Sequence, residues 1–521
     1  MDAGSLESWS TALAAAPSAT SDAVPAARGT VTGFIGRTRR GPVNQPVRVE
    51  DLAAFTRIFG GPSPDTELPR MLAQYFDNGG RSAVVVRVIN GGRSATMSVP
   101  AGASQLRLRA RDPGRHEWLR VSVDHDQLES DPTRFNLVVQ RLGDGQDHRV
   151  VDQEIFRRLS VHPGEPDYVG DVLARSQLVR LLEPAPSERP ERTVNAHGVV
   201  GYIALGADGD DGAPLSDYDL TGSAADATGL FALAAVEGLS LVCVPPLAPG
   251  RDLGPTALAV AERFCRQRGA MLVFDPPQAW RDGRDALRGL PRLGFSSANA
   301  ITYFPRLRER REGGGPVPAA GALAGLLARN DASAGVWRPL DSLTGVVRGG
   351  LTVAGDLADG EVQALRRHGV NVIVRTSAGQ CVLRGDVTFA GHSARVPEWR
   401  SLTRRRLALH VLNTLSHATR WLLFEQCDPV LWARVRHQVG GFLQQLHEAG
   451  AFAGLHPEQS WFVKCDADTV VLDARGQPRL NIVLGIALSR PGEFLIFNIA
   501  HRVEGCRISA MPVTRSLSLS A

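Results

Sequence analysis

Three carboxylates alternate with glycine in the turn Asp208-Gly209-Asp210-Asp211-Gly212, a spacing that resembles part of a calcium loop. A calcium loop also needs a glycine at its sixth position and a helix on each side. Here the glycine, Gly212, stands at the fifth position, and no flanking helix is evident. We therefore expect a solvated turn, with a cation site as the alternative.

Two histidines, His410 and His417, lie seven residues apart on a predicted helix over residues 402–420 and so share one of its faces. A shared face would let two imidazoles bind one metal ion, but no neighbouring cysteine or carboxylate completes a ligand set. We expect both histidines to be packing or surface residues. We expect no metal and no cofactor.

The cysteines favour reduced, buried thiols in a cytosolic protein. No two of them share the CxxC spacing of a zinc site, and they are too far apart to indicate a small disulfide scaffold. The six cysteines are Cys243, Cys265, Cys381, Cys427, Cys465 and Cys506.

Basic residues gather near the start of two predicted helices. They are Arg404, Arg405 and Arg406 in the first helix, and Arg434, Arg436 and His437 in the second. Such runs usually form solvated helix faces. The alternative is a site for an acidic protein partner, because no aromatic residues alternate with these arginines to stack on nucleic acid bases.

The sequence contains no HExxH, GxSxG or Walker A motif. An α/β enzyme, such as a hydrolase or nucleotide-binding protein, is kept as a remote alternative, which a pocket with perturbed carboxylates or histidines would support. With 58 Lys and Arg against 54 Asp and Glu, the net charge is only +4. The overall electrostatic field of the protein therefore gives no indication of nucleic acid or an anionic membrane as a partner.

A length of 521 residues, with 43% hydrophobic and 21% charged residues, predicts a soluble globular protein of two to four domains. The amino terminus lacks the basic region of a secretory signal, so we expect no signal peptide. The most apolar stretch, residues 228–244, is interrupted by Glu237 and followed by two prolines. It predicts a buried helix and strand rather than a membrane span.

Strands and helices alternate in two blocks of the chain, which predicts an α/β layer. Its expected strands are 31–36, 83–89, 239–244 and 270–274, and its expected helices are 49–59, 68–76 and 255–268. Between these blocks, apolar and charged residues alternate in the segments 106–110, 118–124 and 135–142. That alternation indicates a half-exposed antiparallel sheet, and hence an inserted β-rich domain.

A third block is expected to contain helices at 402–420 and 429–449 and strands at 421–425, 480–487 and 493–499. Several stretches along the chain carry sequence motifs that follow one another in the order found in a known family. They include GFIGRTRRGPVNQPVRVEDLAAFTRIFG at 33–60, YFDNGGRSAVVVRV at 75–88, SSANAITYFPRL at 296–307, GVNVIV at 369–374, TRWLLFEQCDPVLWARVR at 419–436 and RPGEFLIFNI at 490–499. Together they resemble the tail sheath family of contractile phages and related injection systems. The resemblance covers about residues 31–90 and 196–505.

Two departures from the family pattern stand out. Residues 1–29 contain no strand of the Pro-Gly-Val-Tyr-Val-Glu-Glu type, and LRGDVT at 383–388 replaces the family's Trp-Gly-Ala-Arg-Thr stretch. The first departure puts strand exchange by the amino-terminal arm in doubt. It also keeps open a specialised sheath paralogue that forms a terminal or baseplate-proximal ring.

The resemblance implies an α/β (α+β) multi-domain fold, with a sheath-like body, an inserted β-rich domain and extended terminal arms. It implies a structural subunit, not an enzyme, which polymerises helically as stacked hexameric rings around an inner tube and contracts from a metastable extended state. The implied partners are further copies of the chain, the inner tube protein, and baseplate and terminal cap proteins, with no nucleic acid and no membrane. The implied location is the bacterial cytoplasm during assembly, and then a phage tail or tail-like particle.

The expected domains are an amino-terminal arm at 1–29, a middle domain at 30–91 and 196–319, an outward-facing insertion at 92–195, a carboxyl-terminal core at 320–500 and a carboxyl-terminal arm at 501–521. The resemblance implies that the arms add strands to neighbouring subunits. The carboxyl-terminal arm is therefore expected to supply an inter-subunit strand with Arg502, Val503, Cys506, Arg507 and Ile508. The candidates to face an acidic tube protein are Arg404, Arg405, Arg434 and Arg436.

Overall fold

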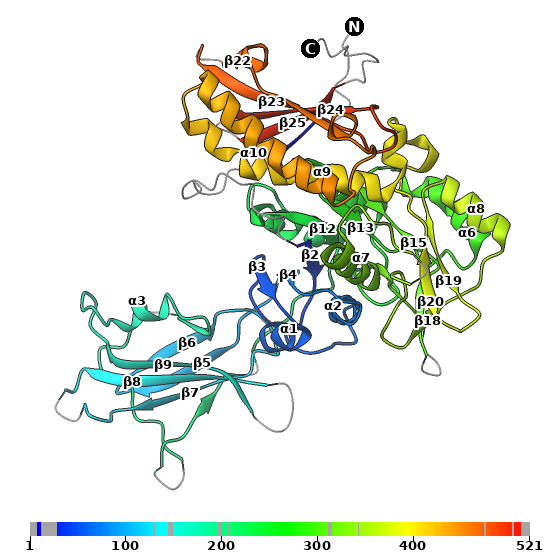
Figure 1. Cartoon of the computed structure of the whole chain (residues 1–521). Coiled ribbons are helices and arrows are strands. Elements are labelled where there is room, and N and C mark those ends of the chain that lie inside the picture. The colour runs from blue at the N-terminus through cyan, green and yellow to red at the C-terminus, as the bar shows by residue number, and fades with distance from the viewer. Residues whose placement is uncertain are drawn as a thin grey trace.

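The computed structural model describes residues 8–11, 29–128, 131–143, 149–182, 184–195, 199–206, 208–310, 315–341, 343–473, 476–502 and 505–511. They form a central body with a β-rich domain at one side, a smaller lobe at the other, and a carboxyl-terminal domain above the body in the view of Figure 1. Across these ranges, no helix is long and apolar enough to cross a membrane.

A six-stranded sheet forms the centre of the body, in the order β14-β13-β12-β2-β4-β3. Its strands are β2 (Val31–Gly36), β3 (Pro46–Val49), β4 (Ala83–Arg87), β12 (Leu239–Cys243), β13 (Met271–Val273) and β14 (Ala300–Ile301). All neighbours run parallel except β3, which pairs antiparallel with β4 at the edge. Parallel strands are usually covered on both faces, which explains the unbroken apolar run of β4.

Helices cover both faces of this sheet. One face packs on α1 (Leu52–Phe59), α2 (Leu68–Asp77) and α7 (Ala320–Ala334). The other packs on α4 (Asp217–Thr221), the 3-10 helix η1 (Gly229–Ala235) and α5 (Pro255–Arg268). Phe34 belongs to the first core and Ile35 to the second, because successive side chains of a strand point to opposite faces. The predicted α/β fold is confirmed.

The β-rich domain consists of two sheets around a core of its own. One sheet has β5 (Thr96–Ala101), β6 (Ser104–Ala110) and β10 (Val179–Leu181), and the other has β7 (Leu119–Asp124), β8 (Arg134–Leu142), β9 (Val150–Ser160) and β11 (Ile203–Ala204). The helix α3 (Val169–Leu173) packs beside β10. The predicted end of the insertion at residue 195 is too early, because β11 pairs with β7. The chain returns to the body at the antiparallel bridge between Asn90 and Ala213.

A buried charged network joins this insertion to the body. Arg87 of β4 is fully buried and donates a hydrogen bond of 2.6 Å to the Gly41 carbonyl. The carboxylate of Glu117, from the insertion, accepts from the Gly41 backbone N–H at 3.2 Å and pairs with Arg141 at 3.2 Å. Burial, and then the nearby charge of Glu117, raise the pKa of Asp112 to about 6. The insertion is therefore held to the body by specific polar contacts, and not only by the two chain segments that connect them.

The smaller lobe is built from short strands and helices. Its sheets are β15 (Tyr303–Phe304) with β19 (Asn371–Arg375) and β20 (Cys381–Arg384), and β16 (Leu307–Glu309) with β17 (Pro316–Val317) and β18 (Leu351–Val353). Its helices are α6 (Gly283–Gly289), η2 (Leu290–Leu293), α8 (Asp359–Arg367), η3 (Gly391–Ser393) and η4 (Pro397–Arg400).

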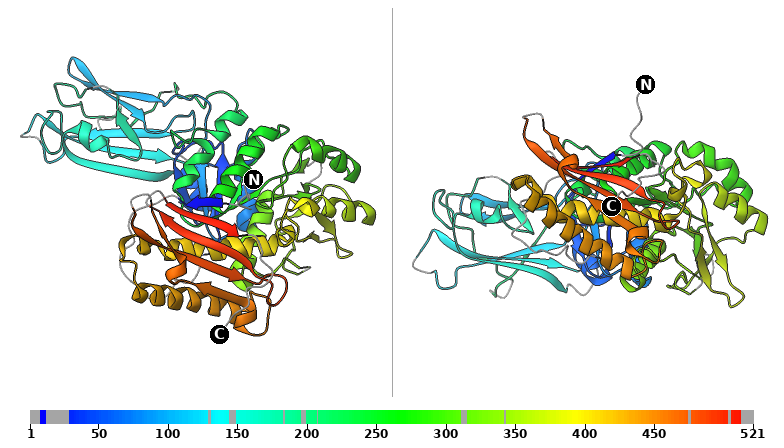
Figure 2. Two further views of the ribbon diagram at one scale, coloured as in Figure 1. Left: turned by 90° about the horizontal axis from the view of Figure 1, so that it is seen from above. Right: turned by 45° about the horizontal axis from the view of Figure 1, so that its top comes forward.

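The carboxyl-terminal domain is a sheet supported by two long helices, α9 (Leu402–Ala418) and α10 (Pro429–Glu448). The remaining elements are η5 (Arg420–Phe424), α11 (Pro457–Ser460), β21 (Trp461–Lys464), η6 (Ala467–Thr469), β22 (Val470–Leu472), β23 (Pro478–Ile486), β24 (Leu495–Arg502), β25 (Gly505–Met511) and β1 (Ser8–Thr11). The sheet order is β1-β25-β24-β23-β21, with β22 also on β23. The helices lie between this sheet and the body (Figures 1 and 2). The strand predicted at 421–425 is wrong, because these residues belong mostly to η5.

Candidate assembly site

The carboxyl-terminal arm forms a strand of the chain's own sheet. β25 pairs antiparallel with β24 over seven residue pairs, from Arg502↔Gly505 to Ile496↔Met511. β1, which lies within the predicted amino-terminal arm, pairs with the other edge of β25. In the single chain the arm thus joins the chain's own sheet, and its expected exchange with a neighbouring subunit stays a prediction. Here β25 already pairs with the backbone N–H and C=O groups along the edge of β24.

The residues predicted for an inter-subunit strand differ in their surroundings. Cys506 is buried and Ile508 is fully buried, and both belong to the large core shared with the body. Arg502 and Arg507 are exposed, and Val503 lies outside the described residues. This alternation is that of a half-buried strand. β25 therefore contributes both backbone pairs and apolar side chains to whichever sheet it joins.

Beside this hairpin, His501 of β24 packs against the end of α9. The distance between its Nε2 and the Thr419 Oγ1 is 2.7 Å, and the Thr419 hydroxyl donates to the Leu415 carbonyl at 2.6 Å. The hydroxyl proton is thereby used, so the imidazole donates through Nε2. Burial lowers the pKa of His501 to about 4, and the positive charges of Arg420 and His417 act in the same direction. The packing of β24 on α9 therefore favours a neutral imidazole.

The three arginines that begin α9 lie in different environments. Arg404 is exposed, whereas Arg405 is fully buried. The Nη2 and Nε of Arg405 donate to the Asn299 Oδ1 at 2.6 and 3.1 Å, and its guanidinium lies 4.6 Å from the centre of the Trp399 ring. The prediction that Arg405 faces a tube protein is therefore wrong. Consecutive residues of a helix point about 100° apart, so a run of three arginines cannot stay on one exposed face.

The two candidates on α10 remain near the surface. The guanidinium of Arg434 lies 4.5 Å from the centre of the Trp421 ring. Arg436 is exposed and donates through Nη1 to the carbonyl of Cys465. Both are fixed by contacts within the chain, and with Arg404 they are the basic candidates that can still meet a partner.

The acidic turn lies between β11 of the insertion and α4 of the body. Asp208 accepts from the backbone N–H and the hydroxyl of Thr96 at 2.9 and 2.7 Å, and these bonds lower its pKa. Asp211 forms an ion pair of 2.7 Å with Arg115. Within the described ranges, no group of three or more His, Cys, Asp or Glu side chains could hold a metal ion. His410 and His417 thus belong to no such group.

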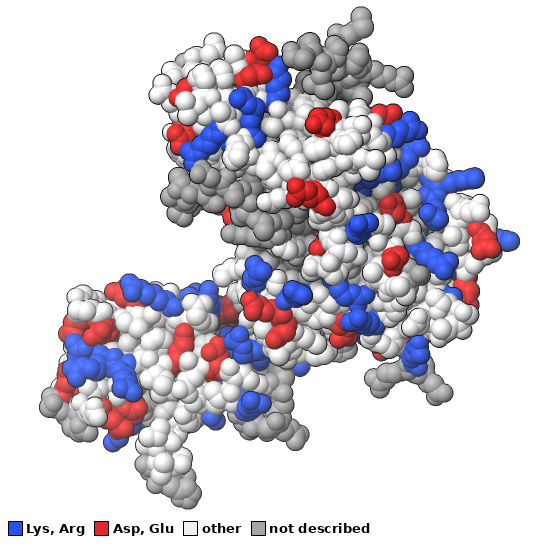
Figure 3. Space-filling model, in the orientation of Figure 1, with Lys and Arg blue, Asp and Glu red and all other residues white. Residues whose placement is uncertain are grey.

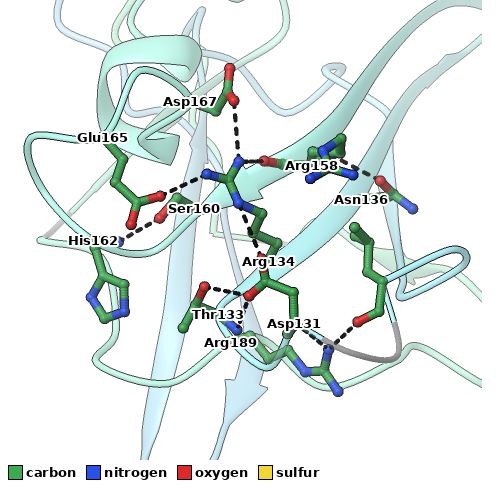
Figure 4. Close-up of polar contacts among 11 residues, drawn as sticks. Asp131, Thr133, Arg134, Asn136, Arg158, Ser160, His162, Glu165, Asp167 and Arg189 are labelled. Atoms are coloured by element: carbon green, nitrogen blue, oxygen red, sulfur yellow. Dashed lines mark hydrogen bonds and ion pairs between the residues drawn. The ribbon is translucent and has the colours of Figure 1, made fainter.

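A second charged cluster lies where β8 begins and β9 ends (Figure 4). The guanidinium of Arg134 pairs with Glu165 at 2.9 Å, Asp167 at 3.2 Å and Asp131 at 3.3 Å, and donates to the Arg158 carbonyl at 2.9 Å. One cation thus holds three carboxylates from two loops, the one before β8 and the one after β9. The cluster fixes this end of the insertion. Figure 3 shows acidic and basic side chains interspersed over the visible surface of the insertion.

An α/β enzyme would bind its ligand at the carboxyl end of the central sheet, between β2 and β12, where the strand order reverses. A Cβ placed on Gly36 at this point would lie 3.1 Å from Pro245 and 3.4 Å from Leu68, so side chains fill the crevice there. Asp275 follows β13 nearby, and burial raises its pKa. Its carboxylate accepts the backbone N–H of Ala319 at 2.6 Å, at the start of α7. This perturbed carboxylate thus has a structural partner.

Comparison with known proteins gives a result at the level of structure only. No protein-family model matches the sequence, and no curated protein matches it significantly. A sheath tail protein from Listeria innocua has the same fold, with 14% identity and a TM-score of 0.62, over 91% of this chain and 94% of that chain. The chain has the fold of contractile tail sheath proteins.

The sheath fold extends to particles other than phage tails. The sheath of the PVC extracellular contractile injection system, in its contracted state, has a TM-score of 0.51 and 16% identity, over 97% of this chain and 96% of that chain. A chain of the anti-feeding prophage baseplate has a TM-score of 0.51 and 17% identity, over 94% of this chain and 100% of that chain. The resemblance inferred from motifs is therefore confirmed at the level of the fold.

Proposed function

We propose that the chain is a structural subunit of a contractile sheath, which polymerises helically around an inner tube and contracts from a metastable extended state. The observation that carries this proposal is the sheath fold over 91% to 98% of the chain. Further support comes from the terminal strands β1 and β25, which lie together at one edge of a sheet. The chain acts through changes in packing and has no enzymatic step. It assembles in the bacterial cytoplasm and becomes part of a phage tail or tail-like particle.

Strand exchange would join the subunits. In the polymer, β25 of one copy takes the place beside β24 of a neighbour, with the same seven residue pairs and the same burial of Cys506 and Ile508. Such an exchange loses no native contact, because identical elements replace one another. Strand pairing holds the copies together while their bodies reorient.

Contraction needs no nucleotide if the contracted lattice is more closely packed. Burial of a few hundred additional Å² of apolar surface per subunit, at about 25 cal/mol per Å², would provide roughly several kcal/mol. A sheath contains many subunits, so these contributions add up along its length. The barrier between the two packings keeps the extended form metastable.

The inner tube is the proposed partner of Arg404, Arg434 and Arg436 in the extended state. Exposed ion pairs are each worth about 1 kcal/mol or less and weaken with salt. That suits an interface that must release during contraction. The insertion faces outward. Baseplate and cap proteins lie at the two ends of the polymer.

A specialised paralogue that forms one ring next to the baseplate is the second candidate. It is favoured by the sheath fold of chains in anti-feeding prophage baseplates, and by the missing amino-terminal strand motif. The two candidates differ in whether assembly stops after one ring.

The experiment is purification of the full chain without a tube protein, followed by negative-stain electron microscopy and sedimentation over a wide concentration range. Long hollow tubes or stacked rings support the main sheath, and single closed rings support the paralogue. A chain that stays monomeric throughout contradicts both candidates. Addition of a purified tube protein then tests Arg404→Glu, Arg434→Glu and Arg436→Glu at low salt, with Arg405 left unchanged. Co-assembly that is unaffected by all three changes would exclude this tube-facing surface.

A further inference from the structure

One face of the insertion's four-stranded sheet is turned away from the core of that domain. Val121 of β7 and Val139 of β8 belong to the core, so the residues on either side of them point outward. Two outward rows of side chains cross the strands, and we call them together the outer face. One row is Tyr202, Ser122, Val138 and Ile155, and the other is Ala204, Arg120, Gln140 and Gln153.

Large side chains are exposed around the outer face. Tyr202 is 43% exposed and Ile155 is 54% exposed. Trp118 is 50% exposed and continues β7, because its carbonyl accepts from the Leu142 N–H at 2.8 Å. Since Leu119 points into the core, Trp118 points outward as Arg120 does. Strand geometry places the Cα atoms of Trp118 and Tyr202 about 14 Å apart.

A ladder of planar polar groups lies between these two aromatic residues. The Nε of Arg120 donates to the Gln140 Oε1 at 2.9 Å, and the Gln140 Nε2 donates to the Gln153 Oε1 at 2.6 Å. The Arg120 guanidinium also lies 4.2 Å from the centre of the Tyr202 ring. Among the described residues, neither the Nη groups of Arg120 nor the Nε2 of Gln153 has an acceptor. The ladder is therefore fixed and keeps donors for a ligand.

We propose that the outer face binds a neutral oligosaccharide, with sugar rings packed on Trp118 and Tyr202 and sugar hydroxyl groups bonded to Arg120 and Gln153. The C–H groups of a sugar ring form an apolar surface that packs on an aromatic ring. Sugar hydroxyl groups both donate and accept hydrogen bonds, and so match amide and guanidinium groups. Two aromatic residues with fixed polar groups between them thus suit a short chain of sugar rings.

The charge of the outer face favours a neutral ligand. Its two rows contain no carboxylate, and Arg120 is their single cation. This guanidinium already has Gln140 and Tyr202 as partners. An anionic polymer would need several cations to offset its repeated charges.

The size of the outer face favours a small ligand over a protein. Four strands and the distance from Trp118 to Tyr202 give a surface of roughly 14 by 14 Å, on the order of 200 Å². A stable protein complex buries about 800 Å² on each partner. Neither another protein nor a second copy of the chain would be held by this surface alone.

Binding at this site does not require a polymer. In a sheath with outward-facing insertions, a consequence that alone rests on the proposed function, many weak sites would act together. They would hold the particle against a polysaccharide on a cell surface.

The test is fluorescence anisotropy of labelled hexasaccharides mixed with the full chain, which works whether or not the chain polymerises. The neutral probes are cellohexaose, xylohexaose, mannohexaose, chitohexaose and maltohexaose, and the anionic probe is a hexasaccharide of alginate. At least one neutral probe should bind. Trp118→Ala and Tyr202→Ala should each weaken its binding about tenfold, because each removes one ring contact. Trp118→Phe should keep most of the affinity.

The matched control is Tyr218→Ala, which removes an aromatic residue that is 86% exposed on α4 of the body and should bind as the unmodified chain does. Circular dichroism should show that all variants are folded. The inference is refuted if no neutral probe binds, if the alginate probe alone binds, or if Trp118→Ala and Tyr202→Ala keep full affinity. None of these results bears on the formation of tubes or rings, so the proposed function stands or fails separately.

Discussion

Acidification should loosen the hairpin of β24 and β25 through one histidine. The folded-state pKa of His501 is lowered from 6.5 to about 4, first by burial and then by Arg420 and His417. The folded chain thus prefers the neutral imidazole. Its contribution to stability is fully present above pH 6.5, and it is lost as the pH falls from 6.5 towards 4. At pH 5 the loss is about 2 kcal/mol relative to pH 7.5.

The measurement is hydrogen exchange of peptides from residues 495–511, read by mass spectrometry at pH 7.5 and pH 5 and corrected for the intrinsic rate. A loss of about 2 kcal/mol corresponds to a roughly thirtyfold fall in protection, if these amides exchange by local opening. His501→Gln keeps an N–H donor for Thr419 but does not titrate. It should retain most of its protection at pH 5. His456→Gln, at an exposed site, is the matched control and should behave as the unmodified chain does. If His501→Gln loses as much protection as the unmodified chain, the imidazole is not the cause.

Three further substitutions test the packing of the single chain by denaturation. Arg405→Ala should destabilise the chain by about 3 kcal/mol, because it removes a buried, hydrogen-bonded and stacked guanidinium, whereas Arg404→Ala should change stability by less than about 0.5 kcal/mol. Equal effects would contradict the buried position. Ile508→Ala should cost about 3 kcal/mol in a soluble subunit and Arg507→Ala almost nothing, and a neutral Ile508→Ala would mean that β25 leaves its own core in solution. Asp112 has a folded pKa of about 6, above its usual 3.8, so its contribution is present below pH 3.8 and is lost as the pH rises through 6. Asp112→Asn should therefore raise stability by up to about 2 kcal/mol at pH 7.5 and by little at pH 4, and a loss at pH 7.5 would show that its charge is needed by neighbouring arginines.

Sequence patterns predicted the elements of the body well where the hydrophobic periodicity agrees with the Pro and Gly residues that mark the ends of an element. The helix expected at 255–268 is α5, with its proline in the first turn and Gly269 in the left-handed conformation after its end. The prediction of a strand at 421–425 failed because a short apolar segment fits a strand or a buried turn of helix equally well. Its position between α9 and α10 decided the outcome through tertiary packing.

The candidate site could be predicted only in part, because its partners are distant in sequence. The pairing of β1 with β25 joins residues from the two ends of the chain, and no local pattern specifies such a register. Arg405 is buried because Asn299, 106 residues away, accepts its hydrogen bonds. His501 was missed for the same reason, since only the packing of β24 on α9 brings it to Thr419. A histidine at a core position of an alternating strand was the single available signal.

The two crossings between the body and the insertion lie side by side, since the Ala213 N–H donates to the Asn90 carbonyl at 2.8 Å. Paired strands are about 5 Å apart, so the body can accept any domain whose own ends lie that close. Recombination can thus replace the insertion without altering the strands and helices of the body. Arg87 sets the condition for such an exchange. A newly acquired domain must bring negative charge near Arg87, as Glu117 and Asp112 now do, or the arginine must be lost, before the junction can be buried at low cost.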